Sequence, residues 1–128
     1  MSQENVEAIR LALEEANHGE FGAHFDAVIH PRLQFRDELG TLDNRDDLRA
    51  YIETFRESFG GFHVEIESVR DLGDKILLVV NQGGHGSLSG VDVEQHFSWV
   101  MTFDQDRCVR WQIYADHADA LEAAGLSK

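Results

Sequence analysis

The spacing of apolar residues changes near Gly61, and this change constrains the fold more than any other feature of the sequence. Before Gly61, apolar residues recur every three or four positions, which is typical of amphipathic helices. After Gly61 they recur at every second position almost to the end of the chain, as in strands that bury one face. The sequence therefore predicts an α+β domain, with helices first and a run of antiparallel strands after them.

Three helices and one short strand are expected in the first half. The first helix carries four apolar residues on one face, Val6, Ile9, Leu13 and Ala16. The second runs from Phe21 to Ile29 and stops before Pro31, because the residue before a proline avoids the α-helical region. Residues 33–37 alternate like a strand, and residues 38–43 are predicted to form a loop. Asn44 caps the third helix, which Gly60-Gly61 ends.

The second half is predicted to form a curved sheet. Its strands are expected at residues 62–67, 75–80, 91–103 and 109–115, followed by a closing helix at residues 116–124. Glycines at positions 83, 84 and 86 permit curvature. Helices packed on one face of such a sheet give a cone, and we expect a ligand pocket at its wide end.

Length and charge narrow the function classes. The chain has 128 residues, enough for a single domain spanning residues 1–128 with one core. Its formal charge of −13 would repel phosphate backbones and anionic lipid, so neither nucleic acid nor a membrane surface is expected as a partner. One cysteine cannot form an internal disulfide, and no leader or membrane-spanning stretch is seen, so a cytoplasmic protein is expected.

Five short motifs, in this order and at this spacing, point to a known family. They are Ala16-Asn17-His18-Gly19-Glu20, Phe35-Arg36-Asp37, Gly40-Thr41, Trp99-Val100-Met101-Thr102-Phe103 and the segment from Val109 to Asp116. Over nearly its whole length, the chain resembles the SnoaL-like branch of the nuclear transport factor 2 superfamily, which also holds ketosteroid isomerase and limonene-epoxide hydrolase. The resemblance implies a cone-shaped antiparallel sheet packed against N-terminal helices, a cystatin-like roll. It also implies a homodimer, in keeping with the mixed surface of Val100, Tyr114 and His96 on the other face of the sheet.

Asp37 is the candidate catalytic residue. The resemblance places it where ketosteroid isomerase keeps the carboxylate that abstracts a proton, a step that also needs stabilisation of the developing enolate. The corresponding tyrosine position looks like Ala12 and the protonated-acid position looks like Trp99, whose indole N–H is a different donor. By the same resemblance, Ile113 occupies the position at which the superfamily's cyclases and epoxide hydrolases carry an acidic residue on the last strand. A structural role for Asp37, accepting hydrogen bonds from the following loop, remains open.

The candidate ligand-binding residues are mostly aromatic or aliphatic. Any one of them alone fits a core position, but as a set in a conical fold they favour a flat, mostly apolar ligand. They are Phe21, Phe35, Tyr51, Phe55, His85, Phe97, Trp99, Met101, Trp111 and Ile113. The seven histidines show no close metal-ligand spacing, so neither a metal nor another cofactor is expected.

Two functions stay open. The first is a protein that binds a small apolar organic molecule, with or without acid–base chemistry at Asp37; as an enzyme it would be a cofactor-independent isomerase, cyclase or hydrolase. The second is a non-catalytic module, a ligand carrier or a protein-interaction domain whose pocket is filled by side chains. Whether the interior around Asp37 is open or sealed distinguishes them.

Overall fold

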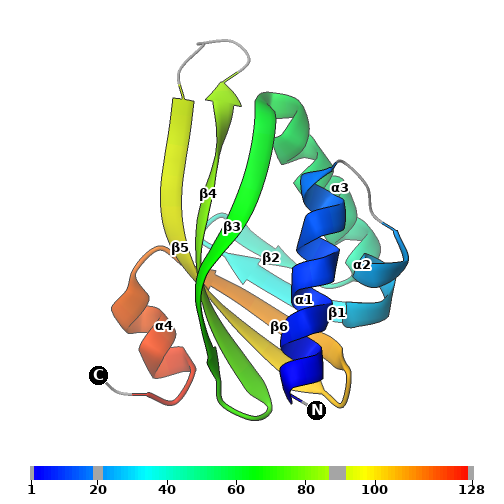
Figure 1. Ribbon diagram of the computed structural model, residues 1–128, viewed down its shortest axis with the longest axis vertical. Coiled ribbons are helices and arrows are strands. Elements are labelled where there is room, and N and C mark those ends of the chain that lie inside the picture. The colour runs from blue at the N-terminus through cyan, green and yellow to red at the C-terminus, as the bar shows by residue number, and fades with distance from the viewer. Residues whose placement is uncertain (1, 19–21, 87–91, 127–128) are drawn as a thin grey trace.

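A six-stranded curved sheet forms the centre of the computed structural model, which describes residues 2–18, 22–86 and 92–126 (Figure 1). Its strands are β1 (Ile29–Asp37), β2 (Gly40–Leu42), β3 (Phe59–Asp71), β4 (Lys75–Gly86), β5 (Asp92–Asp104) and β6 (Arg107–Tyr114). They lie in the order β2-β1-β6-β5-β4-β3. The α+β prediction is confirmed.

The sheet is mixed rather than purely antiparallel. β1 pairs with β6 in parallel, with Phe35 opposite Trp111, whereas the other neighbouring strands pair antiparallel. The expectation of an antiparallel sheet was wrong at this one pairing. Alternation of apolar residues sets which face a strand buries, but the direction of two strands far apart in the chain depends on the connection between them.

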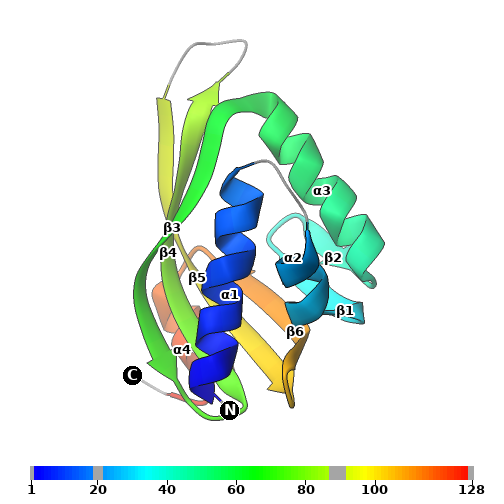
Figure 2. The same ribbon diagram turned by 45° about the vertical axis from the view of Figure 1, so that its right-hand side comes forward.

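Helices cover both faces of the sheet, unequally. Helices α1 (Ser2–Asn17), α2 (Ala23–Val28) and α3 (Arg45–Ser58) lie on the concave side, and α4 (His117–Ala123) lies on the other (Figures 1 and 2). Residues that alternate along a strand point to opposite faces. Accordingly, Leu78 and Trp99 join the main core, while their neighbours Leu77 and Val100 pack with Ala120 of α4.

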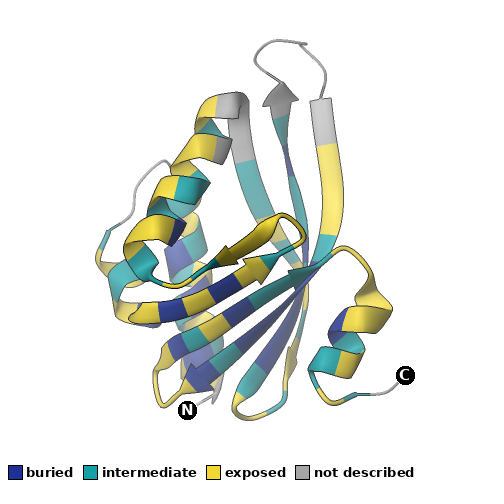
Figure 3. Cartoon of the chain, turned by 180° about the vertical axis from the view of Figure 1, so that it is seen from behind, coloured by how far each residue is buried: buried dark blue, intermediate teal, exposed yellow. Residues whose placement is uncertain are grey.

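Most buried residues of the sheet lie where its central strands pass beneath α1 and α2 (Figure 3). The lower parts of the central strands are mostly buried, while Glu94, Gln95 and His96 on β5 are exposed (Figure 3). Val100, which we expected on a surface shared with a second subunit, is 0% exposed beneath α4.

The C-terminus of α1 is tied to the sheet by a side chain. The Asn17 amide donates from Nδ2 to the Val64 carbonyl at 2.9 Å, and Asn17 Oδ1 accepts from the Val64 N–H at 2.9 Å. Asn17 thereby extends the hydrogen bonding of β3 toward α1. This contact fixes one wall of the main cavity, which lies between α1, α3 and the sheet.

Some element boundaries differ from the prediction. β1 starts at Ile29 and includes Pro31, within a stretch between Ile29 and Gln34 where pairing with β6 is interrupted. A proline there removes no ladder hydrogen bond, so it need not end the strand. The predicted loop at residues 38–43 contains β2, and α3 ends at Ser58, so residues 60 and 61 belong to β3 rather than to a helix cap.

Candidate functional site

A cavity of about 370 Å³ lies between α1, α3 and the concave face of the sheet. Seven of the residues predicted from the sequence line it: Phe35, Asp37, Tyr51, Phe97, Trp99, Trp111 and Ile113. They come from β1, α3, β5 and β6, so the fold brings together positions that span most of the chain. Leu39, 80% exposed, also lines the cavity, which is therefore open to solvent at the β1–β2 turn.

Four predicted residues are not among the lining residues in the part of the chain that the structure describes. Met101 lines a second, smaller hollow of about 40 Å³ that shares the Trp99 and Trp111 rings with the main cavity. Phe21 lies outside the described residues, and so do the side chains of Phe55 and His85, although their backbones belong to α3 and β4.

Several lining residues were not predicted. They are Leu13, Ala16, Asn17, Glu38, Leu39, Ile52, Arg56, Val64, Gln82, Gln95 and Ala115. Two signals in the sequence would have found some of them. Leu13 and Ala16 belong to the apolar stripe of the first helix, and Gln95 shares its strand face with Phe97 and Trp99, where a polar residue among apolar ones marks a hollow rather than a packed core.

The Asp37 carboxylate divides its hydrogen bonds between the backbone and the cavity. Oδ1 accepts from the N–H groups of Leu39 at 2.8 Å and Gly40 at 3.1 Å, which is the structural role that the sequence left open. Oδ2 accepts from the Tyr51 hydroxyl at 2.5 Å. The loop therefore holds Asp37 through one oxygen, and the second oxygen meets a lining residue of the cavity.

Tyr51 is held as a proton donor. Burial, together with the hydrogen bond to Asp37 and the negative charge of its carboxylate, raises the pKa of Tyr51 above its ordinary value. The phenol stays protonated at neutral pH and directs its proton at Asp37.

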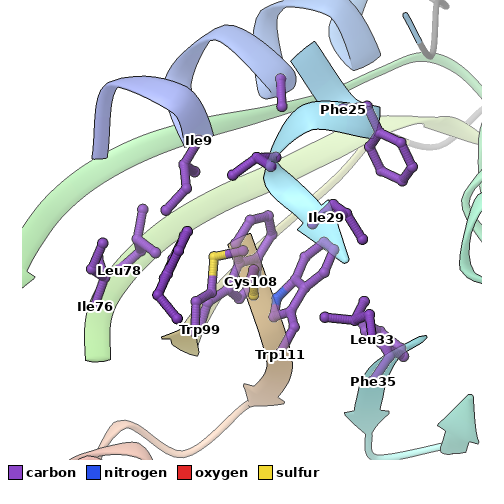
Figure 4. Packing of buried hydrophobic residues seen from close by; sticks show 14 of the residues in the cluster. Ile9, Phe25, Ile29, Leu33, Phe35, Ile76, Leu78, Trp99, Cys108 and Trp111 are labelled. Carbon is purple, nitrogen blue, oxygen red and sulfur yellow. The ribbon is translucent and has the colours of Figure 1, made fainter. Parts of the chain in front are cut away.

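Aromatic rings line the cavity beside this pair, and Figure 4 shows three of the aromatic residues, Phe35, Trp99 and Trp111, in the core. The centroid of Phe35 lies 5.8 Å from that of Tyr51 and 5.2 Å from that of Trp111, edge to face in the second case. Trp111 in turn lies 4.7 Å from Trp99, with the rings inclined at 58°. These spacings are those of favourable aromatic pairs. The wall gives a flat ligand apolar surfaces to pack against.

Ala12 and Trp99 occupy the positions at which ketosteroid isomerase carries the two hydrogen-bond donors that stabilise its enolate, and they line different spaces here. Ala12 is buried and lines the smaller hollow, not the main cavity. Trp99 lines both. Ile113, at the position of the superfamily's last-strand acid, lines the cavity with an aliphatic side chain that neither donates nor accepts a proton. Among the residues that line the main cavity, Asp37 and Tyr51 both carry groups that can exchange a proton, and they are hydrogen-bonded to each other.

Within residues 2–18, 22–86 and 92–126, no group of three His, Cys, Asp or Glu side chains is placed to hold a metal ion. In that same part of the chain, no helix has the length and hydropathy needed to cross a bilayer.

A curved sheet that encloses a cavity against N-terminal helices defines the class of nuclear transport factor 2-like proteins. Within it, the model of the SnoaL-like domain matches residues 9–111, so the chain belongs to the SnoaL-like family. No curated protein sequence matches this chain.

Solved structures of low sequence identity share the fold. A protein from Jannaschia sp. assigned as a SnoaL-like polyketide cyclase is 16% identical with a TM-score of 0.79, over 96% of this chain and 92% of that one. TerC, co-crystallised with polyporic acid, is 15% identical with a TM-score of 0.76, over 95% and 98%. A ketosteroid isomerase-like protein from Catenulispora acidiphila, in complex with trimethylamine, is 17% identical with a TM-score of 0.73, over 98% and 95%. At such identities the likeness establishes the fold alone.

Proposed function

We propose that this protein binds a small, flat and mostly apolar organic molecule in the cavity between α1, α3 and the sheet. The observation that carries the proposal is a cavity of about 370 Å³ walled by aromatic rings and bordered by one hydrogen-bonded carboxylate. Ligand pockets in proteins have volumes of about 300–1,000 Å³ and a similar mixture of apolar walls and few polar groups. Two proteins of the same fold were crystallised with small molecules, polyporic acid and trimethylamine.

The binding proposal is tested by filling the cavity. Val64 lines it from β3, whereas Val69, on the same strand, packs against the core without lining it. We expect the wild-type protein and Val69→Phe to bind fluorene, a flat three-ring hydrocarbon, in equilibrium dialysis, and Val64→Phe to lose most of that binding. Circular dichroism checks that both variants fold. Equal binding by the two variants would place the hydrocarbon elsewhere and overturn the proposal.

Acid–base chemistry at Asp37 is the second candidate function. Its support is the position of Oδ2, which meets the Tyr51 hydroxyl at the cavity wall while Oδ1 is fixed by the loop. A carboxylate so placed could remove a proton next to a carbonyl group, as an isomerase or cyclase requires. Oδ2 accepts one hydrogen bond from Tyr51 and keeps a second lone pair, so this hydrogen bond lowers the basicity of Oδ2 without blocking it.

The chemistry is tested without knowing the natural substrate. In D₂O, 1-tetralone exchanges the protons beside its carbonyl, and nuclear magnetic resonance follows that exchange. We expect the wild-type protein to accelerate it and Asp37→Asn, with the same shape, to lose the acceleration. If both proteins accelerate exchange equally, Asp37 is not the base. If ligands bind and neither protein accelerates exchange, the protein is a carrier, which is the alternative function with an open rather than a filled pocket.

We also propose that the protein is a cytoplasmic homodimer. α4 covers Val100 and packs against Tyr114, so a second subunit would contact the part of the outer sheet face around the exposed His96. His96 there pairs with Glu67, Nε2 to Oε2 at 3.2 Å. A polar contact of this kind suits the rim of an interface more than its centre.

A further inference from the structure

The charged side chains around the main cavity do not balance. In the part of the chain that the structure describes, the charged residues that line it are Asp37, Glu38 and Arg56, two carboxylates and one guanidinium. Arg56 donates from Nη2 to the Ala16 carbonyl in the last turn of α1. The carbonyl end of a helix carries partial negative charge, which offsets part of the charge of Arg56. A ligand with one positive charge would therefore leave the cavity closer to neutral than an uncharged ligand or an anion would.

The Asp37 carboxylate offers an acceptor at the mouth of the cavity. Its Oδ1 is occupied by the backbone of the β1–β2 turn, whereas Oδ2 accepts one hydrogen bond, from Tyr51, and keeps a second lone pair. Asp37 is half-buried, beside the turn at which the cavity opens to solvent. A donor on a ligand that enters there can share Oδ2 with the Tyr51 hydroxyl.

Two aromatic rings stand beside that carboxylate. Phe35 lies two positions before Asp37, so both side chains leave the same face of β1. The ring centroids of Phe35 and Tyr51 are 5.8 Å apart, with the rings inclined at 59°, and both residues line the cavity. The faces of aromatic rings carry partial negative charge and attract a cation within about 6 Å of the ring centre. The corner formed by Asp37, Phe35 and Tyr51 therefore suits a cation and repels an anion.

We propose that the ligand of this cavity is an arylalkylamine in its protonated form. Its ammonium group donates a charge-assisted hydrogen bond to Asp37 Oδ2 and lies against the rings of Phe35 and Tyr51. Its aromatic part extends toward Trp111, whose ring contacts that of Phe35. The proposal rests on the binding function proposed above and names its ligand class. It does not rest on the acid–base function, because the ammonium group would occupy the oxygen that acts as the base there.

The charge of the whole chain favours the same sign of ligand. A formal charge of −13 raises the local concentration of cations and lowers that of anions. This long-range attraction is screened over about 8 Å at 0.15 M salt. A test of the proposal must therefore separate it from the local effect of Asp37.

The test compares three compounds that share one skeleton. N,N-dimethyl-2-naphthylmethylamine is a cation at pH 7, 2-isobutylnaphthalene is its uncharged analogue, and 2-naphthylacetate is the anion of the same shape. Equilibrium dialysis in 0.15 M salt measures the affinity of the protein for each. We expect the wild-type protein to bind the cation about tenfold more tightly than the anion, because a single charge at the corner favours one and opposes the other.

A pair of variants isolates the local charge. Asp37→Asn keeps the shape of the side chain and an oxygen for the turn, but removes the charge. It should weaken binding of the cation about tenfold and change binding of 2-isobutylnaphthalene much less. The matched control is Asp71→Asn at the end of β3, because Asp71 also closes a turn, accepting from the Gly73 N–H at 3.0 Å, and does not line the cavity. Both variants remove one negative charge from the chain, so a difference between them reports the charge at the cavity.

The wild-type protein gives a second readout that does not depend on the folding of a variant. Methyl groups that lie over the face of an aromatic ring have proton magnetic resonance signals shifted upfield. We expect the N-methyl signal of the bound amine to shift upfield and to show nuclear Overhauser contacts with the ring protons of Tyr51. If the bound amine shows neither, its ammonium group lies away from the corner and the proposal is overturned.

The dialysis results that would overturn the proposal differ in what they say of the cavity. If the anion binds more tightly than the cation, Arg56 rather than Asp37 sets the charge of the ligand. If Asp37→Asn and Asp71→Asn weaken binding of the cation equally, the net charge of the chain is responsible. If 2-isobutylnaphthalene and fluorene bind and the cation does not, the cavity takes uncharged ligands and the proposed binding function stands without this ligand class. If none of these compounds binds, that function fails as well.

Discussion

Asp37 joins a local role and a long-range one in a single side chain. Its Oδ1 closes the turn after β1, a contact between residues two and three positions apart, and its Oδ2 meets Tyr51, which lies 14 positions further along the chain. The local role follows from aspartate at the end of a strand. The contact with Tyr51 requires α3 to lie across β1, which residue types alone do not specify.

The Asp37–Tyr51 hydrogen bond is expected to stabilise the fold. Removing the donor with Tyr51→Phe should lower the free energy of unfolding by about 1–2 kcal/mol, because a carboxylate acceptor makes the bond stronger than a neutral pair. Urea denaturation at pH 7 measures it. The matched control is Tyr114→Phe, at the chain's other tyrosine, which packs beneath α4; we expect a change below about 0.5 kcal/mol there.

The same pair predicts a dependence on alkaline pH. The pKa of Tyr51 is raised in the folded protein, so the contribution of its phenol is complete below the ordinary value of about 10 and is lost as the pH rises above it. The stability difference between the wild-type protein and Tyr51→Phe should therefore narrow from pH 9 to pH 11. A difference that stays constant over this range would contradict the raised pKa.

Cys108 is expected to be chemically inert in the folded protein. It is 0% exposed, and burial raises the pKa of its thiol to about 12. At pH 8 the reactive thiolate is scarce and covered, so a disulfide reagent such as dithionitrobenzoate should label it no faster than the protein unfolds. In urea one thiol per chain should react promptly. Fast labelling of the folded protein would show that the covering side chains open readily.

At the scale of elements, a helix end and a strand are joined by one amide. Asn17, at the end of α1, makes two hydrogen bonds to the backbone of Val64 on β3, which lies 47 positions further along the chain. Both residues also line the cavity. The contact therefore stabilises the packing of α1 and the shape of the site at the same time.

The substitution Asn17→Ala is expected to lower the stability of the fold and to weaken ligand binding in the cavity. We expect the free energy of unfolding to fall by about 1–2 kcal/mol, because two backbone groups at the edge strand lose their partner. Fluorene binding should weaken as well, since the cavity wall loses its support. Gln3→Ala, at an exposed position of the same helix, serves as the control and should change neither quantity. Loss of stability with unchanged binding would show that α1 keeps its place without this contact.

At the scale of the whole molecule, the acidic charge and the covered outer face bear on association. α4 removes part of the sheet from any interface, and a formal charge of −13 opposes the approach of two copies. We expect a dimer nevertheless at micromolar concentration in 0.15 M salt, where screening reduces this repulsion. Sedimentation equilibrium measures it, and a monomer at all concentrations up to about 100 μM would contradict the proposal.

The sequence by itself determined the α+β class, the order of the helices and of every strand except β2, and the aromatic residues that line the cavity in the described part of the chain. It did so because the period of apolar residues is set locally by helix and strand geometry. The family resemblance that rested on short motifs is confirmed as well.

Only the tertiary structure decided how distant segments meet. The parallel pairing of β1 with β6, the contact of Tyr51 with Asp37 and the packing of the Trp99 and Trp111 rings all depend on where elements far apart in the chain come to lie. Strand alternation says which face a side chain takes, but not which side chain from another element it will meet there. The cavity and its polar contacts arise from those meetings.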